Sequence, residues 1–283
     1  MHRVRLLLLG ASASIGLLAL LYLVARGTAL GLRLDGAATE LGLTEGRAPR
    51  IHDATTDVLR TIDVSSLALF GGGTIVLALL RRRIGHALAI AGLLVGANVT
   101  TQLLKPFLAD ASVPGVGPSQ AAVGTFPSGH ATVAMSLGLA AILAVPEGLR
   151  AVAALAGAGY ATAVGVALVA LEWHYPSDVV GGYLVASAWA ALLAAGVVAV
   201  GMQDPRRAFV SGAPVAAVLL LAAGAFAIIV GVAIARRPEL VVLGRLHTAF
   251  FASAVGLATA SIAITGSIAV LIEPSPRRAA PRG

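Results

Sequence analysis

Long apolar segments recur along the whole chain, and they constrain its fold more than any other feature. Eight such segments cover residues 6–25, 64–80, 84–104, 131–145, 151–171, 179–200, 214–235 and 248–272. About 20 apolar residues in a helix cross the hydrocarbon core of a bilayer, where a helix also satisfies its own backbone hydrogen bonds. A composition of 58% hydrophobic and 12% charged residues excludes a soluble domain. We therefore expect an all-α, polytopic membrane helical bundle.

Three segments leave room for alternatives. A cleavable signal peptide is the alternative to a first span at 6–25, but the stretch is long for a signal and no clear cleavage site follows, so we expect a retained helix. The segment 131–145 reaches a spanning length only if its helix begins at the preceding polar residues, which places His130 at the membrane face. Residues 51–62 have apolar residues at helical spacing and indicate either a short interfacial helix or an ordinary loop.

Arginines in the short loops predict the orientation. If the helices alternate, one side of the membrane receives the arginines of residues 2–5, 81–83, 150, 206–207 and 277–282. This side should be the cytoplasm of a multi-pass protein in the cell's inner (plasma) membrane. The topology accounts for the net charge of +7, and no basic patch with interleaved aromatic residues indicates nucleic-acid binding. The absence of cysteine excludes disulfides and thiolate metal sites.

The opposite, extracytoplasmic face collects three polar segments that are distant in sequence. They are the end of the third span at Lys105, residues 127–130 (PSGH, here called the PSGH segment) and residues 172–178 (EWHYPSD). Lys105 is also the only lysine in the chain. Ionisable residues at membrane depth are costly and usually functional. Their convergence predicts a functional site at this face.

The PSGH segment has the composition of a helix N-terminus that binds an anion. Ser128 can cap the free backbone N–H groups, and Gly129 lets a ligand approach the main chain. The alternative is a simple helix cap with an interfacial His130. Lys105 suits an anionic headgroup, and its alternative role is that of a lysine extending to the interface.

Residues 174–178 place a carboxylate four residues after a histidine. Asp178 can hold one ring nitrogen of His174 and aim the other at a substrate, as for an oriented nucleophile or base. The pair could instead form a helix cap or two ligands of a metal. Since only His130 offers a further ligand, we expect neither a metal nor another cofactor.

Lys105, the PSGH segment and the H-x-x-x-D pair of residues 174–178 occur in an order that resembles the type 2 phosphatidic acid phosphatase (PAP2) superfamily of membrane lipid phosphate phosphatases. The resemblance implies a six-helix core within residues 1–208, with the motifs within 105–178. Residues 209–283 would add two further transmembrane helices and a short basic tail that the resemblance does not explain.

The resemblance also implies a metal-independent hydrolysis of lipid phosphates or diphosphates through a phosphohistidine at the extracytoplasmic face. His174 would be the nucleophile, Asp178 its orienting partner, and His130 the acid that protonates the leaving oxygen. Lys105 and the backbone of Ser128 and Gly129 would hold the phosphoryl oxygens. The expected partners are the bilayer and a phosphorylated lipid, either a polyprenyl phosphate or a glycerolipid.

Two arginines of the family's motifs are absent. The first motif has an arginine shortly after the lysine, where this chain has Asp110 or Ser112. The third has Ser-Arg before the histidine, where Ala167 and Leu168 stand. Each missing guanidinium could contribute about 1.5–3 kcal/mol of charge-assisted binding. The loop before the last span offers three replacement cations, unless they only anchor the flanking helices in the interface: Arg236, Arg237 and Arg245.

Three functions therefore remain open. The first is a lipid phosphatase with a different set of cations. The second is a catalytically weak or inactive relative that binds a phosphorylated lipid or partners another membrane enzyme. The third is a transferase that passes the phospho-group to an acceptor other than water. A homodimer is compatible with each of them.

Overall fold

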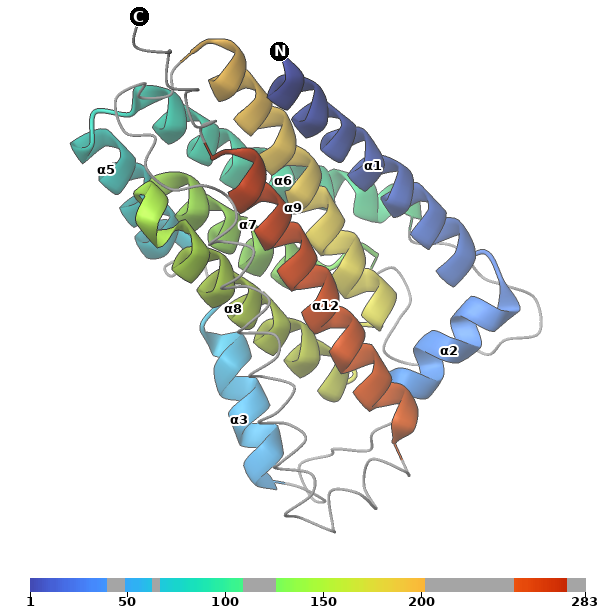
Figure 1. Cartoon of the computed structure of the whole chain (residues 1–283). Coiled ribbons are helices and arrows are strands. Elements are labelled where there is room, and N and C mark those ends of the chain that lie inside the picture. The colour runs from blue at the N-terminus through green and yellow to red at the C-terminus, as the bar shows by residue number, and fades with distance from the viewer. Residues whose placement is uncertain (40–48, 63–66, 109–125, 202–246, 274–283) are drawn as a thin grey trace, which may run out of the picture.

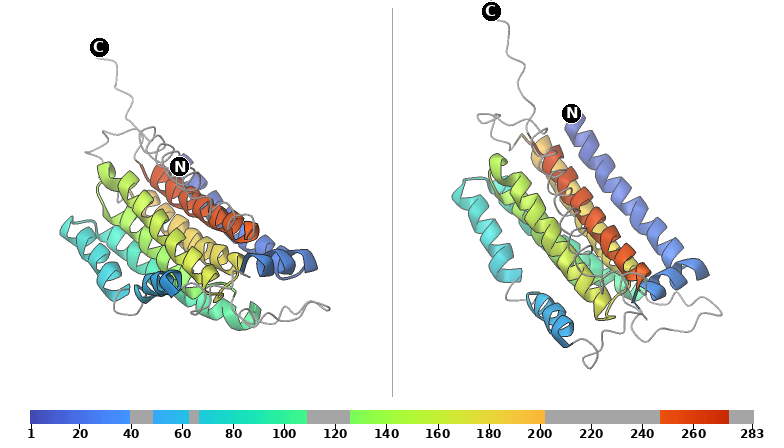
Figure 2. Two further views of the ribbon diagram at one scale, coloured as in Figure 1. Left: turned by 90° about the horizontal axis from the view of Figure 1, so that it is seen from below. Right: turned by 60° about the horizontal axis from the view of Figure 1, so that its bottom comes forward.

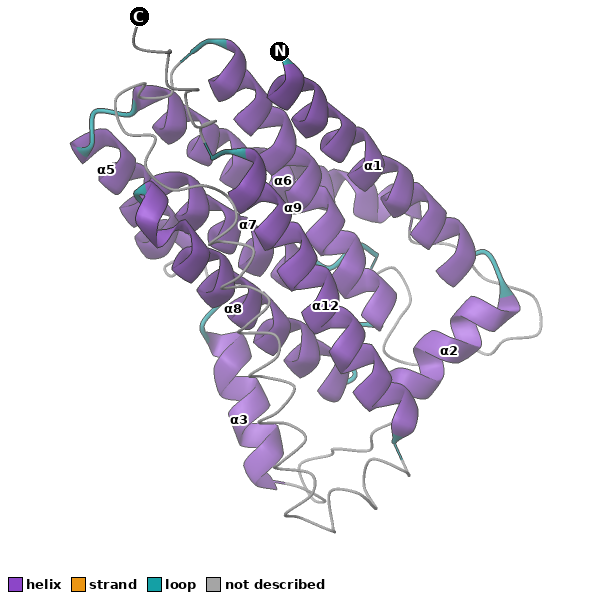
Figure 3. Cartoon of the chain, in the orientation of Figure 1, coloured by secondary structure: helices purple, strands orange, loops and turns teal. Residues whose placement is uncertain are grey.

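The computed structural model describes residues 1–39, 49–62, 67–108, 126–201 and 247–273 (Figure 1). The described residues are largely helical, and none of them forms a strand (Figure 3). The α-helices are, in chain order, α1 (His2–Ala25), α2 (Ala29–Thr39), α3 (Pro49–Arg60), α5 (Gly72–Leu80), α6 (Ile84–Leu108), α7 (Gly129–Ala144), α8 (Arg150–Ala170), α9 (Pro176–Ala199) and α12 (Thr248–Leu271). Short helical turns at Leu67–Gly71 and Glu147–Leu149 precede α5 and α8. The prediction of an all-α helical bundle is confirmed.

Five helices of the described chain are long and apolar enough to cross a membrane, namely α1, α6, α8 with its preceding turn, α9 and α12. α7 and the segment Leu67–Leu80 are apolar but shorter. Seven of the predicted spans are thus helices, and the chain is a multi-pass membrane protein. The predicted span at 214–235 lies outside the described residues.

α1 packs along α9, from which it is distant in sequence (Figure 1). Leu7 and Ala11 of α1 are buried. Farther along the helix, the hydroxyl groups of Ser14 and Ser187 lie 3.1 Å apart in a buried hydrogen bond. The first apolar segment is therefore a helix of the bundle.

α7 lies at the centre of the bundle, and the views of Figure 2 show its neighbours running along it. It contacts α5, α6, α8, α9 and α12. Its contact with α8 is made backbone to backbone, because a Cβ atom on Gly138 would lie only 2.9 Å from the Cα atom of Gly157. Small residues of this kind let membrane helices approach closely. Since protein surrounds α7 on several sides, its first turn is fixed by packing.

α3 covers most of residues 51–62, so this segment is a helix and not an ordinary loop. It packs against α8. Just after it, the hydroxyl groups of Thr61 and Tyr160 lie 3.0 Å apart. Its position in the membrane interface stays a prediction.

α12 belongs to the same bundle, although it lies beyond the six helices that the motifs imply. It packs against α8 and α9. The hydroxyl groups of Thr162 and Ser261 lie 2.7 Å apart between α8 and α12. At the end of the helix, the Arg150 guanidinium donates to the carbonyl of Ile272 at 3.3 Å.

Candidate active site

The PSGH segment and residues 172–178 meet at the end of the bundle where α7 and α9 begin. The backbone N–H of Ser128 donates to the carbonyl of Asp178 at 2.9 Å, which joins the two segments directly. Two glycines of α9 make this contact close: a Cβ atom on Gly182 would lie 2.6 Å from the Ser128 carbonyl, and one on Gly181 would lie 2.8 Å from the Phe126 ring. The predicted convergence of these segments is therefore present.

α7 begins as the composition of the PSGH segment predicts. Ser128 is fully buried and its side chain accepts a hydrogen bond from the N–H of Ala131 at 3.4 Å, so that it caps the helix. The first N–H groups of a helix have no partner within the helix and are available to an anion. The residue at this opening is Gly129, which has no side chain to cover it.

Lys105 lies beside this helix start. Its amine is 3.5 Å from the position that a Cβ atom on Gly129 would occupy, and the amide nitrogen of Gln102 is 3.4 Å from the same point. Both side chains come from the last turns of α6, three residues apart and hence on one face. The hydroxyl groups of Thr101 and Thr132, 2.9 Å apart and buried, fix α6 to α7 at this level. An amine, an amide and a helix N-terminus thus surround one small space.

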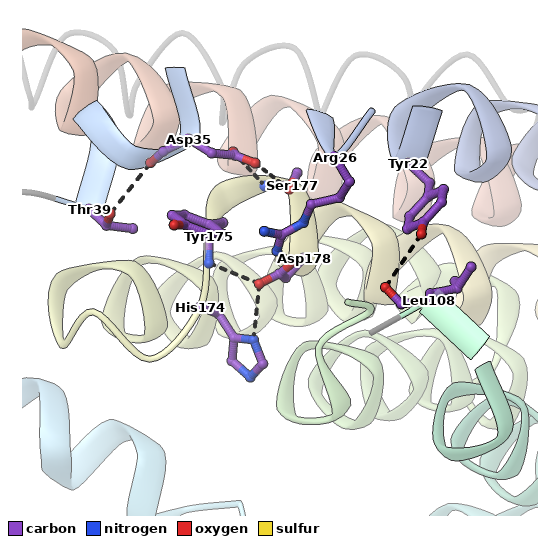
Figure 4. A network of polar contacts seen from close by, with 9 residues as sticks. All are labelled: Tyr22, Arg26, Asp35, Thr39, Leu108, His174, Tyr175, Ser177 and Asp178. Atoms are coloured by element: carbon purple, nitrogen blue, oxygen red, sulfur yellow. Dashed lines mark hydrogen bonds and ion pairs between the residues drawn. The ribbon is translucent and has the colours of Figure 1, made fainter. Parts of the chain in front are cut away.

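His174 and Asp178 form the predicted pair (Figure 4). The Nδ1 atom of His174 lies 3.4 Å from Oδ2 of Asp178, and the same oxygen accepts from the backbone N–H of Tyr175 at 3.1 Å. Asp178 is fully buried and His174 nearly so. With Nδ1 held by a carboxylate, the other ring nitrogen, Nε2, is the one left for a substrate. Hydrogen bonds of this type are often long without substrate and tighten when it binds.

His130 occupies the first turn of α7 and is half-buried. His174 and Lys105 both lie close enough to interact electrostatically with its ring. The Trp173 ring lies edge-on to it, with the ring centroids 6.2 Å apart, and this tryptophan is 49% exposed. His130 is therefore close to the other site residues and near the mouth of the site.

All six residues assigned to catalysis and phosphate binding therefore gather at one end of the bundle. The Ser128 N–H, however, is occupied by the Asp178 carbonyl, so the prediction that this N–H holds a phosphoryl oxygen is corrected. The three candidate replacement cations, Arg236, Arg237 and Arg245, lie outside the described residues. Within the described part of the chain, no group of three or more histidine, aspartate or glutamate side chains is placed to hold a metal ion.

Comparison with known families agrees with this geometry. Residues 82–202 match the family model described as the PAP2 superfamily. We call residues 82–202 the PAP2 domain because of this match. The domain runs from the turn before α6 to the end of α9 and includes every motif residue named above. The match to this superfamily supports a phosphatase-type function. Searches of curated proteins and of solved structures give no significant match.

Two charged residues from outside the PAP2 domain contact it beside the motif pair (Figure 4). The Arg26 guanidinium, at the end of α1, pairs with Oδ1 of Asp178 and lies over the Tyr175 ring, 4.5 Å from its centroid. Asp35, on α2, accepts hydrogen bonds from the backbone N–H of Ser177 at 3.2 Å and from its hydroxyl at 2.5 Å. Sequence reasoning missed both, because an arginine directly after an apolar span is typical of an interface anchor.

Asp35 is buried in a region that already holds another carboxylate. The pKa of Asp35 is raised to about 6, chiefly by burial and also by the Asp178 carboxylate, while the Ser177 hydrogen bonds and Arg26 act in the opposite direction. Asp35 is thus ionised at neutral pH and loses its charge as the pH falls through about 6. The ionised form suits its place at the N-terminus of α9, where the helix dipole favours a negative charge.

Gly182 provides a test of the contact that joins the two motif segments of the PAP2 domain. Gly182→Ala puts a Cβ atom 2.6 Å from a backbone oxygen and 2.9 Å from the backbone nitrogen of Thr132, so the start of α7 must shift. We expect at least a roughly tenfold loss of activity and a stability loss of about 1–3 kcal/mol, as for other overpacked sites. Gly196→Ala on the same helix meets nothing within 4 Å and is the control. Equal activity of both variants would contradict the role of this contact.

Proposed function

We propose that the protein is a membrane lipid phosphate or diphosphate phosphatase that works through a phosphohistidine intermediate at the extracytoplasmic face and needs no metal. The observation that carries this proposal is the buried His174–Asp178 pair, which lies beside the open N-terminus of α7 and the amine of Lys105. A nucleophile, an orienting carboxylate and donors for an oxyanion are then present at one place.

The reaction proposed has two steps. In the first, Nε2 of His174 attacks phosphorus, the bond to the leaving oxygen breaks, and His130 gives that oxygen a proton. In the second, water attacks the phosphohistidine, His130 accepts a proton from that water, and His174 is released with inorganic phosphate. Asp178 holds the His174 ring in one orientation and stabilises its positive charge in the intermediate.

Lys105, Gln102 and the backbone N–H groups at Gly129 are proposed to hold the phosphoryl oxygens. They surround the same small space, and fixed donors stabilise the charge that develops on these oxygens in the transition state. Gln102 adds a neutral donor that the sequence motifs do not contain. The set carries less positive charge than a site with two further arginines.

A lipid is the substrate class that the surroundings of Lys105 support. The neighbouring α6 side chains Leu103 and Phe107 are 62% and 81% exposed on the outside of the bundle. A headgroup beside Lys105 can therefore keep its apolar tail along α6 in the bilayer. This arrangement suits polyprenyl phosphates and glycerolipids equally.

A catalytically weak or inactive, lipid-binding relative is the second candidate function. It is favoured by a specific observation: Arg26, a buried arginine at the site, is already paired with Asp178 and lies on the other side of that carboxylate from His174 (Figure 4). It therefore does not take the place of the absent motif arginines at the phosphate.

Phosphate release by the purified protein tests the proposal. Polyprenyl phosphate, polyprenyl diphosphate, phosphatidic acid and phosphatidylglycerol phosphate are offered in the presence of a chelator, beside a His174→Ala control. We expect release of inorganic phosphate from at least one of them by the wild-type protein alone. Binding without release would favour the second candidate, and transfer to an added alcohol in place of water would identify a transferase.

Lys105 offers a prediction about phosphate binding. Lys105→Met removes the amine beside Gly129, and we expect kcat/KM to fall roughly 10- to 100-fold, the scale of a lost charge-assisted hydrogen bond. Lys105→Arg keeps the charge and should retain more activity. Steady-state kinetics on the best substrate measures both. A change of less than about threefold in Lys105→Met would remove this residue from the site.

The membrane orientation can be measured by labelling single cysteines, since the chain contains none. Arg33→Cys places a cysteine at an exposed position of α2, at the end of the bundle that holds the site. Gly148→Cys places one in open space in the turn before α8, at the other end of the bundle. We expect an impermeant thiol reagent to label the first in intact cells and the second only after permeabilisation. The reverse pattern would place the site in the cytoplasm.

A further inference from the structure

We propose that Arg26 is a positioning residue for the His174–Asp178 pair, so that α1 and α2 take part in catalysis although they precede the PAP2 domain. This inference rests on the proposed function. It concerns a residue that none of the motifs contains, on a helix outside the matched residues 82–202.

Asp178 makes contacts through both of its carboxylate oxygens. Its two carboxylate oxygens are divided between different partners: Oδ1 pairs with Arg26, whereas Oδ2 faces His174 Nδ1 and the N–H of Tyr175. A carboxylate held at both oxygens cannot rotate without losing one of these contacts. Arg26 therefore determines which oxygen is presented to the His174 ring.

Burial makes this pairing strong. Asp178 is fully buried and Arg26 is 6% exposed. A buried charge that loses its partner is strongly destabilised, because its desolvation is no longer compensated. Arg26 thus allows an ionised carboxylate to remain in the protein interior next to His174, where it can orient the ring.

The end of α1 holds Arg26 in place. Its backbone N–H donates to the carbonyl of Tyr22 at 2.9 Å, and its guanidinium stacks on the Tyr175 ring. A Cβ atom on Gly27 would lie 2.3 Å from the Leu23 carbonyl, so the chain can turn this tightly only with glycine after Arg26. The planar guanidinium is therefore preorganised, which an amine on a flexible chain would not be.

α2 adds a second contact to the same helix start. Asp35 binds the N–H and hydroxyl groups of Ser177, the residue directly before Asp178. α1 and α2 thus hold the first turn of α9 at two points. Arg26 pairs with the Asp178 carboxylate, and the Asp35 carboxylate accepts from the Ser177 N–H. Both contacts keep Asp178 at a fixed distance from His174.

Arg26 acts through Asp178 and not on the phosphate itself. Figure 4 shows Arg26 and the His174 ring on opposite sides of the Asp178 carboxylate. The donors at Gly129 come from α6 and α7, and Arg26 is not among them. Loss of Arg26 should therefore slow the chemical step and leave phosphate binding unchanged.

The test is a double-mutant cycle of Arg26→Gln and Asp178→Asn, with Arg26→Lys and the exposed Arg33→Gln as further variants. For Arg26→Gln we expect kcat to fall about 10- to 100-fold, while KM and the inhibition constant of inorganic phosphate stay within about twofold. Arg26→Lys should restore part of kcat, and Arg33→Gln should match the wild type. In the Asp178→Asn background, Arg26→Gln should change kcat less than threefold.

Thermal unfolding of the same proteins gives a readout that does not depend on activity. Each single variant leaves one buried group unpaired, so the double variant should lose less in Tm than the sum of the two single losses. If Arg26→Gln does not fold, two comparisons still test the pairing. One compares Arg26→Lys with the wild type, and the other compares the double variant with the single variant Asp178→Asn.

Three results would overturn the inference. Equal increases of KM and of the phosphate inhibition constant in Arg26→Gln would make Arg26 a phosphate-binding residue. An undiminished effect of Arg26→Gln in the Asp178→Asn background, or additive losses in Tm, would show that it does not act through Asp178. A wild-type protein that releases no phosphate would instead contradict the proposed function itself, which separates the two failures.

Discussion

Replacement of His174 by alanine is expected to lower phosphate release by at least about four orders of magnitude. Removal of the group that forms a covalent intermediate has effects of this size in other enzymes. Within the described residues, no second histidine is held by a carboxylate in the way that Asp178 holds His174. The measurement is the initial rate of phosphate release from the best lipid substrate, with a chelator present throughout.

The control for this variant is His2→Ala, which removes an exposed histidine at the opposite end of the bundle. It should be as active as the wild type. Unchanged thermal unfolding of His174→Ala would show that the loss is chemical and not structural. Residual activity within about tenfold of the wild type would contradict the assignment, as would activity that disappears with the chelator and returns with a divalent cation.

Replacement of His130 by alanine is expected to have the second largest effect, and the size of this effect should depend on the leaving group. A general acid contributes roughly 100- to 10,000-fold when the leaving oxygen needs a proton. A lipid alcohol needs one, whereas a nitrophenolate leaves readily without it. We therefore expect kcat to fall roughly 100- to 10,000-fold on an alkyl phosphate. On an alkylated nitrophenyl phosphate, the fall in kcat should be less than about tenfold.

Comparison of the two substrates distinguishes proton donation from other roles of His130. Its ring also lies edge-on to Trp173, so the variant could disturb the mouth of the site. A structural disturbance would reduce both rates to a similar extent. Equal losses on the two substrates would thus contradict the assignment of His130 as the acid, while Trp173→Phe should leave the ratio of the two rates unchanged.

The parts of the site that the sequence predicts are those at helix ends. Long apolar segments mark the helices, so the positions of Lys105, the PSGH segment and His174 at one end of the bundle follow from the alternating direction of successive helices. The spacing of His174 and Asp178 is local, and it is sufficient to predict their contact. Predicting the positions of these residues requires no knowledge of how the helices pack.

Contacts between distant helices could not be predicted in this way. Arg26 and Asp178 are 152 positions apart, and their pairing depends on how α1 packs along α9. The approach of Gln102 to Gly129 depends on the packing of α6 against α7, although its spacing from Lys105 placed both on one face. The close fit at Gly182 depends in the same way on tertiary structure.

The central claim is that a phosphoryl group is transferred to His174, and locating that group tests it most directly. The enzyme is mixed with its lipid substrate and a chelator, quenched within milliseconds in alkali, digested and analysed by mass spectrometry. The account predicts a phosphoryl group on His174 in the wild type and none in His174→Ala. A phosphoryl group on another residue, or turnover without any phosphorylated residue, would contradict it.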